Sequence, residues 1–297
     1  MTDRLFLAAD TGGTQMRAAV VDATGRIRSR RSAATPGHAE APGALLDLIG
    51  TVRAECPDDI AHAVVGLPGV VDYSSGRLLW APHLPDSWPD LLSSDELSSR
   101  LRLPVFVAND ADLAAVGEAV FGAGAGSADV AYLTISTGIG AGVVHSGRLI
   151  RGTRSLAEVG HTVIDWRAWR AGSPGELEDV GSGSGLARLA REAALGDLDA
   201  RAIQHAAEAG DQRAASLWQD AIAACAAGVS NLVLSFYPSV VVIGGGLGCQ
   251  FEFFAAVRAL VTAHPERHPN DLKIVQSSLR DDAGLAGAAA WRAATAS

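Results

Sequence analysis

Two glycine-rich turns in this sequence carry the groups best suited to bind a polyphosphate. Each follows an apolar run and combines hydroxyl side chains with glycines, which let backbone N–H groups approach an anion closely. A carboxylate at the start of the first turn could orient a metal-bound water beside the phosphates. Either turn alone is also typical of an ordinary hairpin, but the pair together favours phosphate binding. The residues are Asp10, Gly12, Gly13 and Thr14 in the first turn and Ser136, Thr137 and Gly138 in the second.

A third glycine run, Gly244, Gly245 and Gly246, follows the apolar stretch 240–243 and precedes a helical pattern. A backbone without side chains could lie against a flat ligand such as a nucleotide base and its ribose. The spacing does not match the GxGxxG fingerprint of dinucleotide-binding folds. A simple turn at the start of a helix explains these glycines equally well, so both interpretations stay open.

The pair Asn109–Asp110 directly follows the apolar stretch 103–108. Catalytic groups are common at the carboxyl ends of strands in α/β proteins. A carboxylate there can accept the proton of a substrate hydroxyl as it attacks phosphorus, and the amide can orient that hydroxyl. Asn and Asp are also preferred at helix N-caps, and sequence spacing does not separate the two roles.

Glu158, His161 and Glu178 lie in a polar, glycine-rich stretch that also contains Trp166 and Trp169. Carboxylates and an imidazole suit hydrogen bonding to several sugar hydroxyls, and indole rings suit the C–H faces of a sugar. Solvated loop residues are the alternative interpretation. Neither HExxH nor a repeated Cys/His spacing points to a metal site.

The composition narrows the classes of function. The chain has 297 residues, with 24 Lys and Arg against 33 Asp and Glu, and its net charge of −9 argues against a nucleic-acid partner. It contains no run of 18 apolar residues and no signal-peptide pattern, so we expect a cytoplasmic protein with no membrane partner. The three scattered cysteines favour neither a disulfide framework nor a cysteine zinc site.

The single lysine, Lys273, excludes two phosphate-binding mechanisms. It does not lie in a GxxxxGK(S/T) P-loop, and the protein-kinase pattern of a strand lysine followed by an HRD loop is missing. Any phosphate chemistry must therefore use backbone amides, hydroxyls, arginine or a metal ion.

The elements that must position these residues follow from hydrophobic periodicity. Each half of the chain opens with a strand, a Gly/Thr turn and a second strand, and then alternates strands with helices. This order predicts two α/β lobes with an active site between them. The predicted strands are 5–10, 17–22, 61–66, 103–108, 130–136, 240–246 and 273–276, and the predicted helices are 41–54, 111–121, 212–236, 251–263 and 284–294.

Seven motifs, taken in chain order, resemble the ROK family of bacterial sugar kinases and repressors within the actin-like ATPase superfamily. The resemblance covers nearly the whole chain, from Asp10 to the final helix. The motifs are Asp10-Thr-Gly-Gly-Thr14, Gly66-Leu-Pro-Gly-Val-Val-Asp72, 103–111 with Gly117-Glu118, 136–142, Glu158-Val-Gly-His161, Gly175-Glu-Leu-Glu178 with Ser182-Gly183, and Ile243-Gly-Gly-Gly-Leu247.

The resemblance implies an ATP-dependent kinase that phosphorylates the 6-hydroxyl of a glucose-like hexose, with two ribonuclease-H-like lobes and an interlobe active-site cleft. It implies an N-terminal lobe of residues 1–111 plus 282–297 and a C-terminal lobe of residues 112–281. Asp110 would be the general base. The sugar would be bound by Gly69, Asn109, Asp110, Glu158, His161 and Glu178. ATP would be bound by the Asp10 and Ser136 turns and, at adenosine, by Gly244–Gly246, with Mg²⁺ near Asp10.

Departures from the family pattern concern its structural zinc, which the histidine of ExGH and three cysteines usually hold. Trp169, Ala171 and Glu176 stand where those cysteines would be. We therefore predict no zinc, a loop held by tryptophan packing, and His161 serving the sugar alone. His83 and Ala108 also depart from the pattern and leave the identity of the sugar open.

Alternative functions follow from these departures. The substrate alternatives are an amino sugar, such as kanosamine or an N-acetylated hexosamine, and a C7-cyclitol; polyphosphate is an alternative donor. A repressor would carry a winged helix-turn-helix before Asp10, where only nine residues stand. The Asn109–Asp110 pair argues against a non-catalytic sugar-sensing regulator. Many family members are dimers, so a homodimer is an open expectation.

Overall fold

The computed structural model describes residues 4–12, 15–36, 41–56, 59–81, 92–155, 158–173, 175–264 and 271–296. The chain forms two units, which are described separately. The first unit comprises Met1–Ala128, Gly142–Leu156 and Asp281–Ser297, and the second comprises Asp129–Ala141 and Ala157–Arg280.

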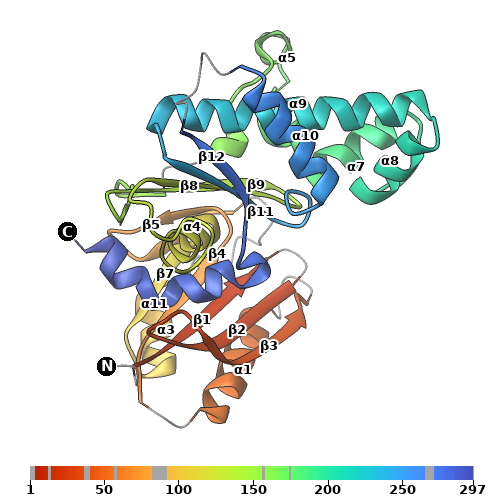
Figure 1. Cartoon of the computed structure of the whole chain (residues 1–297). Coiled ribbons are helices and arrows are strands. Elements are labelled where there is room, and N and C mark those ends of the chain that lie inside the picture. The colour runs from red at the N-terminus through yellow and green to blue at the C-terminus, as the bar shows by residue number, and fades with distance from the viewer. Residues whose placement is uncertain are drawn as a thin grey trace. The chain divides into compact units, whose positions relative to one another are not determined.

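A five-stranded sheet forms the centre of the first unit (Figure 1). Its order is β3-β2-β1-β4-β7, in which β1, β2 and β3 are antiparallel neighbours and β1, β4 and β7 run parallel. A meander followed by parallel strands is the arrangement expected of a ribonuclease-H-like lobe. The strands are β1 (Leu5–Thr11), β2 (Gln15–Asp22), β3 (Ile27–Ala34), β4 (Ile60–Leu67) and β7 (Val105–Asn109).

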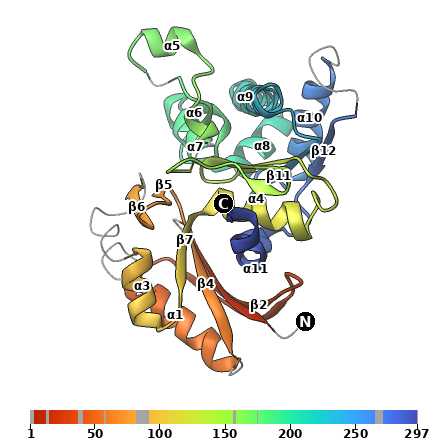
Figure 2. The same cartoon turned by 90° about the vertical axis from the view of Figure 1, so that its left-hand side faces the viewer.

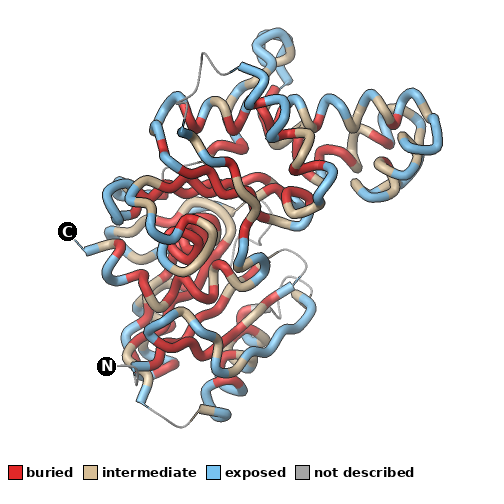
Figure 3. Tube along the Cα trace, in the orientation of Figure 1, coloured by how far each residue is buried: buried red, intermediate tan, exposed pale blue. Residues whose placement is uncertain are grey.

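Helices cover both faces of this sheet (Figure 2). Helix α1 (Ala41–Glu55) packs on one face, where alternate residues of β1 and β2 share a core with Leu45, Ile49 and Val52. Helices α4 (Asp110–Phe121) and α11 (Ala283–Thr295) lie on the other face. The edge strand β3 is mostly exposed, whereas β1 is buried almost throughout (Figure 3). The remaining elements of this unit are β5 (Val70–Asp72), β6 (Arg77–Trp80), α3 (Ser94–Leu101) and η3 (Arg280–Asp282).

The first unit extends further along the chain than the expected boundary at residue 111. Helix α4 belongs to it because α4 and α11 cross with their backbones in close approach: a Cβ on Gly117 would lie 2.0 Å from the Ala283 carbonyl oxygen, and one on Gly287 would lie 2.1 Å from that of Leu113. Residues 142–156 also belong to it. The Arg151 guanidinium, for example, donates to the Thr295 carbonyl at 2.9 Å.

The second sheet repeats the order of the first. It runs β10-β9-β8-β11-β12, and β8, β11 and β12 are parallel. Two sheets of this kind confirm the predicted ribonuclease-H-like α/β fold. The strands are β8 (Val130–Ile135), β9 (Ile139–His145), β10 (Arg148–Leu149), β11 (Val240–Gly244) and β12 (Lys273–Gln276).

Helix α9 (Gln212–Phe236) is the long core helix of the second unit. Among the described residues it alone is long and apolar enough to cross a membrane by length and composition, but 44% of its most apolar window is buried. It packs against β8 and against the helices α6, α7, α8 and α10, as a core helix does. The helices of this unit are α5 (Trp166–Arg170), α6 (Leu177–Gly181), α7 (Gly183–Glu192), α8 (Ala200–Glu208), α9 and α10 (Phe251–Thr262), with the 3-10 turn η1 (Val159–His161).

Candidate active site

Asp10 lies near the carboxyl end of β1, directly opposite Arg17 of β2. The Arg17 guanidinium contacts the Asp10 carboxylate at 3.4 Å and the Asp281 carboxylate at 3.3 Å. Burial raises the pKa of Asp10, although the charge and hydrogen bond of Arg17 oppose this shift. The chain turns directly after Asp10, where the Gly12 N–H donates to the Gln15 carbonyl at 2.9 Å. Gly13 and Thr14, also expected to bind ATP, lie outside the described residues.

Asn109 is the N-cap of α4, so the structure supports the capping interpretation for this residue. Its side-chain oxygen accepts the Asp112 N–H at 3.0 Å, and its amide nitrogen donates to the Gly69 carbonyl at 2.9 Å. Asp110 follows as the first residue of the helix, where its carboxylate accepts the Ala111 N–H at 2.9 Å. A helix N-terminus is a favourable place for a carboxylate because the backbone dipoles point their positive ends at it.

The predicted phosphate turn and the predicted base lie at the same edge of the first sheet. Asp10 is in register with Gly66 of β4, and Gly66 is in register with Ala108 of β7. Adjacent strands lie about 4.8 Å apart, so the Asp10 and Ala108 backbones are separated by about 10 Å. The carboxyl ends of parallel strands form the usual ligand-binding edge of such sheets.

Tyr73, which was not among the site residues predicted from the sequence, holds the Asn109–Asp110 junction in place. Its phenol donates to the buried Asp112 carboxylate at 2.6 Å and accepts the Asn109 N–H at 3.2 Å. Burial and the nearby Asp112 charge raise the pKa of Tyr73 far above its ordinary value, so the phenol stays a donor. No residue spacing predicts this contact, because it joins positions 39 residues apart.

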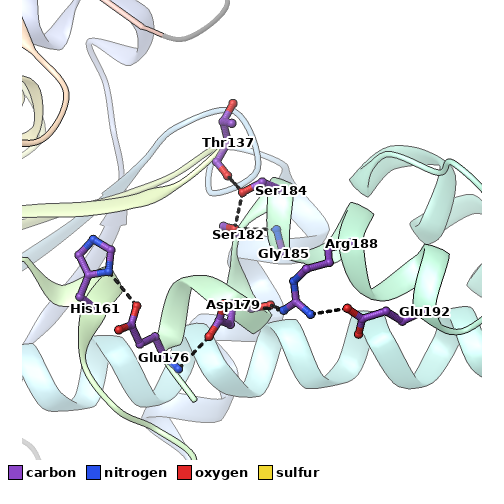
Figure 4. Close-up of polar contacts among 9 residues, drawn as sticks. All are labelled: Thr137, His161, Glu176, Asp179, Ser182, Ser184, Gly185, Arg188 and Glu192. Atoms are coloured by element: carbon purple, nitrogen blue, oxygen red, sulfur yellow. Dashed lines mark hydrogen bonds and ion pairs between the residues drawn. The ribbon is translucent and has the colours of Figure 1, made fainter. Parts of the chain in front are cut away.

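The Ser136 turn of the second unit rests on the start of α7 (Figure 4). The Gly183 N–H donates to the Ser136 carbonyl at 2.8 Å, and the Ser184 hydroxyl donates to the Thr137 carbonyl at 2.6 Å. The Ser136 and Thr137 side chains are exposed. The carbonyls of this turn are therefore used for packing, while its two hydroxyl-bearing residues are exposed, as phosphate binding would require.

Glu178 connects the two groups of predicted binding residues in the second unit. One of its carboxylate oxygens accepts the Ile139 N–H, at the end of the Ser136 turn, at 2.6 Å. A Cβ on Gly138 would lie 2.5 Å from this same oxygen. A Cβ on Gly160, inside the Glu158–His161 motif, would lie 3.4 Å from it. Three motifs that are distant in sequence thus meet at one carboxylate. The predicted binding of sugar by Glu178 stays a prediction.

The three glycines at the end of β11 and directly after it differ in their surroundings. A Cβ on Gly244 would lie 2.3 Å from the Tyr132 hydroxyl, and one on Gly245, whose φ is +82°, would lie 2.4 Å from the Ile135 carbonyl oxygen. These two glycines are explained by packing and backbone conformation. Gly246 is exposed, and its nearest neighbour would be the Ser136 hydroxyl at 3.9 Å. Gly246 therefore remains the glycine best placed to lie against a nucleotide.

His161 does not stand alone, contrary to the expectation from the sequence. Its Nδ1 lies 2.8 Å from the Glu176 carboxylate (Figure 4). The expected tryptophan packing of this loop is also wrong, because the side chains of Trp166 and Trp169 are 55% and 63% exposed. Both residues lie on the short helix α5, where the Arg167 guanidinium lies 4.5 Å from the centroid of the Trp166 ring. His83, the other departure from the family pattern, lies outside the described residues.

The donor atoms of this loop do not fit a structural zinc ion. Trp169 and Ala171 offer no ligand, and Glu176 already holds the His161 nitrogen. The described part of the chain contains no group of three or more His, Cys, Asp or Glu residues that could bind a metal ion. Structural zinc requires four such ligands in a tetrahedral arrangement.

Comparisons with known proteins identify the family of this chain. Residues 6–295 match the ROK family. The chain is 36% identical over 290 residues to a bifunctional NanE/NanK enzyme of Brucella melitensis, covering 95% of this chain but 53% of that protein, so it spans about half the length of that relative. It is 32% identical to an N-acetylmannosamine kinase of Shigella boydii, covering 95% and 96% of the two chains.

A solved structure extends the similarity to the fold. A ROK family glucokinase from Streptomyces griseus, in complex with glucose and AMPPNP, matches with a TM-score of 0.81 and 31% identity, covering 97% of this chain and 98% of that chain. Sequence and fold thus point to the same group of proteins. The chain belongs to the ROK family.

Proposed function

We propose that this chain is an ATP-dependent sugar kinase that transfers the γ-phosphoryl group to the 6-hydroxyl of a hexose. The observation that carries the proposal is the placement of Asp10 and Asn109–Asp110 at one edge of the first sheet, on parallel strands in register. A polyphosphate turn and a carboxylate base that follow strands whose backbones, at Asp10 and Ala108, lie about 10 Å apart suit an in-line phosphoryl transfer between a nucleotide and a hydroxyl.

Asp110 is the general base in this proposal. As the 6-oxygen of the sugar attacks the γ-phosphorus, the hydroxyl proton passes to the Asp110 carboxylate. The bond from the γ-phosphorus to its bridging oxygen breaks, and ADP leaves. Asn109 and Gly69 hold the backbone next to Asp110 in place, because the Asn109 amide bonds both the Gly69 carbonyl and the Asp112 N–H.

Asp10 fits the role of a partner for Mg²⁺. It is a partly buried carboxylate beside a turn with little side-chain bulk, and Mg²⁺ in nucleotide sites usually takes one or two protein carboxylates with phosphates and waters. When bound, Mg²⁺ neutralises the charge that develops on the phosphates. The Gly12 and Ser136 turns, with Gly246, would bind the rest of ATP.

The sugar is bound in this proposal by Glu158, His161 and Glu178 of the second unit. Glucose is the default substrate, supported by the likeness to the Streptomyces griseus glucokinase. An N-acetylated hexosamine is the main alternative, supported by the likeness to the Shigella boydii N-acetylmannosamine kinase. Kanosamine and C7-cyclitols remain further alternatives from the sequence, as polyphosphate does for the donor.

A substrate panel tests the proposal. Glucose, mannose, N-acetylmannosamine, N-acetylglucosamine, kanosamine and a C7-cyclitol are each offered with Mg²⁺ and either ATP or polyphosphate, and the sugar phosphate is identified by mass spectrometry and ³¹P NMR. The matched control is the 6-deoxy form of the best sugar, which lacks the attacking hydroxyl. We expect 6-phosphate formation that the 6-deoxy sugar does not support. Sugar binding without phosphorylation of any member would overturn the proposal in favour of a sugar sensor.

The cytoplasmic location and the homodimer expected from the sequence stay predictions. Analytical ultracentrifugation with and without sugar measures the oligomeric state directly.

A further inference from the structure

Backbone hydrogen bonds close the loop in which ROK relatives carry zinc. The N–H groups of Ile164 and Asp165 donate to the Gly175 carbonyl at 2.9 and 3.1 Å, and the Leu177 N–H donates to the Thr162 carbonyl at 3.0 Å. Asp165 then caps α5, accepting the N–H groups of the next turn. These bonds join the two ends of the loop, so the loop does not need a metal ion to close.

The Glu176 carboxylate is thus not required for closing the loop. Glu176 is the N-cap of α6, where its N–H donates to the Asp179 carboxylate at 3.2 Å as one half of a capping box between the two residues. From this fixed position the side chain reaches His161, with 2.8 Å between Oε2 and Nδ1. In Figure 4 the other ring nitrogen of His161 lies on the side away from Glu176.

A carboxylate that accepts the N–H of one imidazole nitrogen fixes both the ring orientation and the tautomer. With Nδ1 as the donor to Glu176, the neutral ring presents an acceptor at Nε2, and the protonated ring presents a donor there. Partial burial opposes protonation, but the hydrogen bond and charge of Glu176, with the charges of Glu178 and Glu158, outweigh it and raise the pKa of His161.

We propose that Glu176 is a positioning residue for sugar binding, because its carboxylate holds the His161 ring through Nδ1 and so directs Nε2 to the sugar. This inference rests on the proposed function. Glu176 stands at one of the three positions where the family resemblance places a zinc-binding cysteine. In this chain an ion pair with Glu176 would therefore orient the imidazole, as a zinc ion would in zinc-containing relatives.

Two substitutions of Glu176 separate positioning from loop structure. Glu176→Ala removes the acceptor, whereas Glu176→Gln keeps an amide oxygen that can accept the same hydrogen bond. We expect Glu176→Ala to raise the Kd and KM for the best sugar by about five- to twentyfold, with the KM for ATP unchanged. Glu176→Gln should restore at least half of that loss on a logarithmic scale. Glu192→Ala is the control, because it removes an exposed ion pair with Arg188 in the same unit.

Four measurements decide the outcome. Sugar Kd is measured by isothermal titration calorimetry, turnover by ADP release, folding by thermal melting, and zinc by elemental analysis before and after chelation. Unchanged sugar Kd in Glu176→Ala, or a loss equal in sugar and ATP binding, would overturn the positioning role. Stoichiometric zinc whose removal weakens sugar binding would overturn it as well.

The two proposals fail in different ways. If the wild-type protein binds sugar but does not phosphorylate it, the proposed kinase activity fails, and the comparison of Kd values still tests Glu176. If the wild-type protein phosphorylates sugar and Glu176→Ala behaves like Glu192→Ala, the kinase stands and the positioning role fails. If the wild-type protein binds no sugar in the panel, both fail.

Discussion

The Tyr73 hydroxyl donates a 2.6 Å hydrogen bond to the carboxylate of Asp112, a residue with no exposed surface. The same hydroxyl accepts the Asn109 N–H at 3.2 Å, and the Asn109 amide holds the Gly69 carbonyl. One phenol thus joins the segment after β5 to the junction between β7 and α4. This junction carries the proposed catalytic base.

Tyr73→Phe should therefore reduce both stability and turnover. The substitution leaves the buried Asp112 carboxylate without its phenol donor, which costs about 1–3 kcal/mol in the free energy of unfolding. The loosened Asn109–Asp110 junction should lower kcat several-fold with little change in the KM for ATP. Urea unfolding and steady-state kinetics measure the two effects. Tyr237→Phe, at a residue that is 63% exposed, is the control, and identical behaviour of the two variants would contradict the role of Tyr73.

Asp110→Asn should abolish catalysis without unfolding the protein. Loss of a general base lowers kcat by about 10²- to 10⁴-fold. Asparagine keeps an oxygen that can accept the Ala111 N–H, so the start of α4 should stay intact. Sugar binding by calorimetry and phosphorylation rate measure the split between binding and chemistry. Turnover within threefold of wild type would remove Asp110 from the role of base.

Asp10→Asn should lower turnover without lowering the stability of the protein. Because burial raises the pKa of Asp10 in the folded protein, its charge opposes folding at neutral pH, and this opposition fades as the pH falls through the raised pKa. The neutral variant should therefore be at least as stable as wild type at pH 7.5, with the difference shrinking toward acid pH. Turnover with MgATP should fall by about 100-fold or more.

Thermal melts between pH 5 and pH 7.5 measure the stability difference, and steady-state kinetics with MgATP measure the loss of turnover. A marked loss of stability in Asp10→Asn at pH 7.5 would show instead that the Asp10–Arg17 ion pair is mainly structural. Glu96→Gln is a useful control, since it neutralises a carboxylate that forms a 2.6 Å ion pair with Arg100 within α3.

Gly245→Ala and Gly246→Ala form a matched pair. At Gly245 the positive φ and the nearby Ile135 carbonyl should make alanine destabilising by about 1–3 kcal/mol. At Gly246 an alanine Cβ would lie 3.9 Å from the Ser136 hydroxyl, an ordinary van der Waals distance, so stability should hold while the KM for ATP rises several-fold if adenosine lies against this position. The melting temperature measures the change in stability, and steady-state kinetics measure the change in the KM for ATP. An unchanged KM for ATP in Gly246→Ala would move adenosine away from this loop.

The pH dependence of sugar binding should change in Glu176→Gln. Glu176, Glu178 and Glu158 hold the pKa of His161 above its ordinary value, so the protonated ring persists to higher pH in wild type. Removing the Glu176 charge lowers that pKa. The alkaline fall in kcat/KM for the sugar should therefore begin at lower pH in Glu176→Gln, and a profile that does not move would show that His161 acts in its neutral form.

Local patterns in the sequence predicted most of the architecture. Strand β12 and helix α9 occur at the residues expected, 273–276 and 212–236, because alternation and apolar length are properties of the segment itself. The short helices α5 to α8 were not predicted. They lie in a polar, glycine-rich region, where the side-chain caps Ser182 and Asp199 mark the starts of the amphipathic helices α7 and α8.

The sequence by itself determined the α/β class, the family and the identity of the candidate catalytic groups, since these depend on motif order and on the ends of strands. Only the tertiary structure decided which groups are partnered. The Tyr73–Asp112 bond, the hold of Glu178 on Ile139 and the His161–Glu176 pair each join residues 15 or more positions apart. Such contacts depend on how the elements pack, and packing is a property of the whole folded chain and of no single segment.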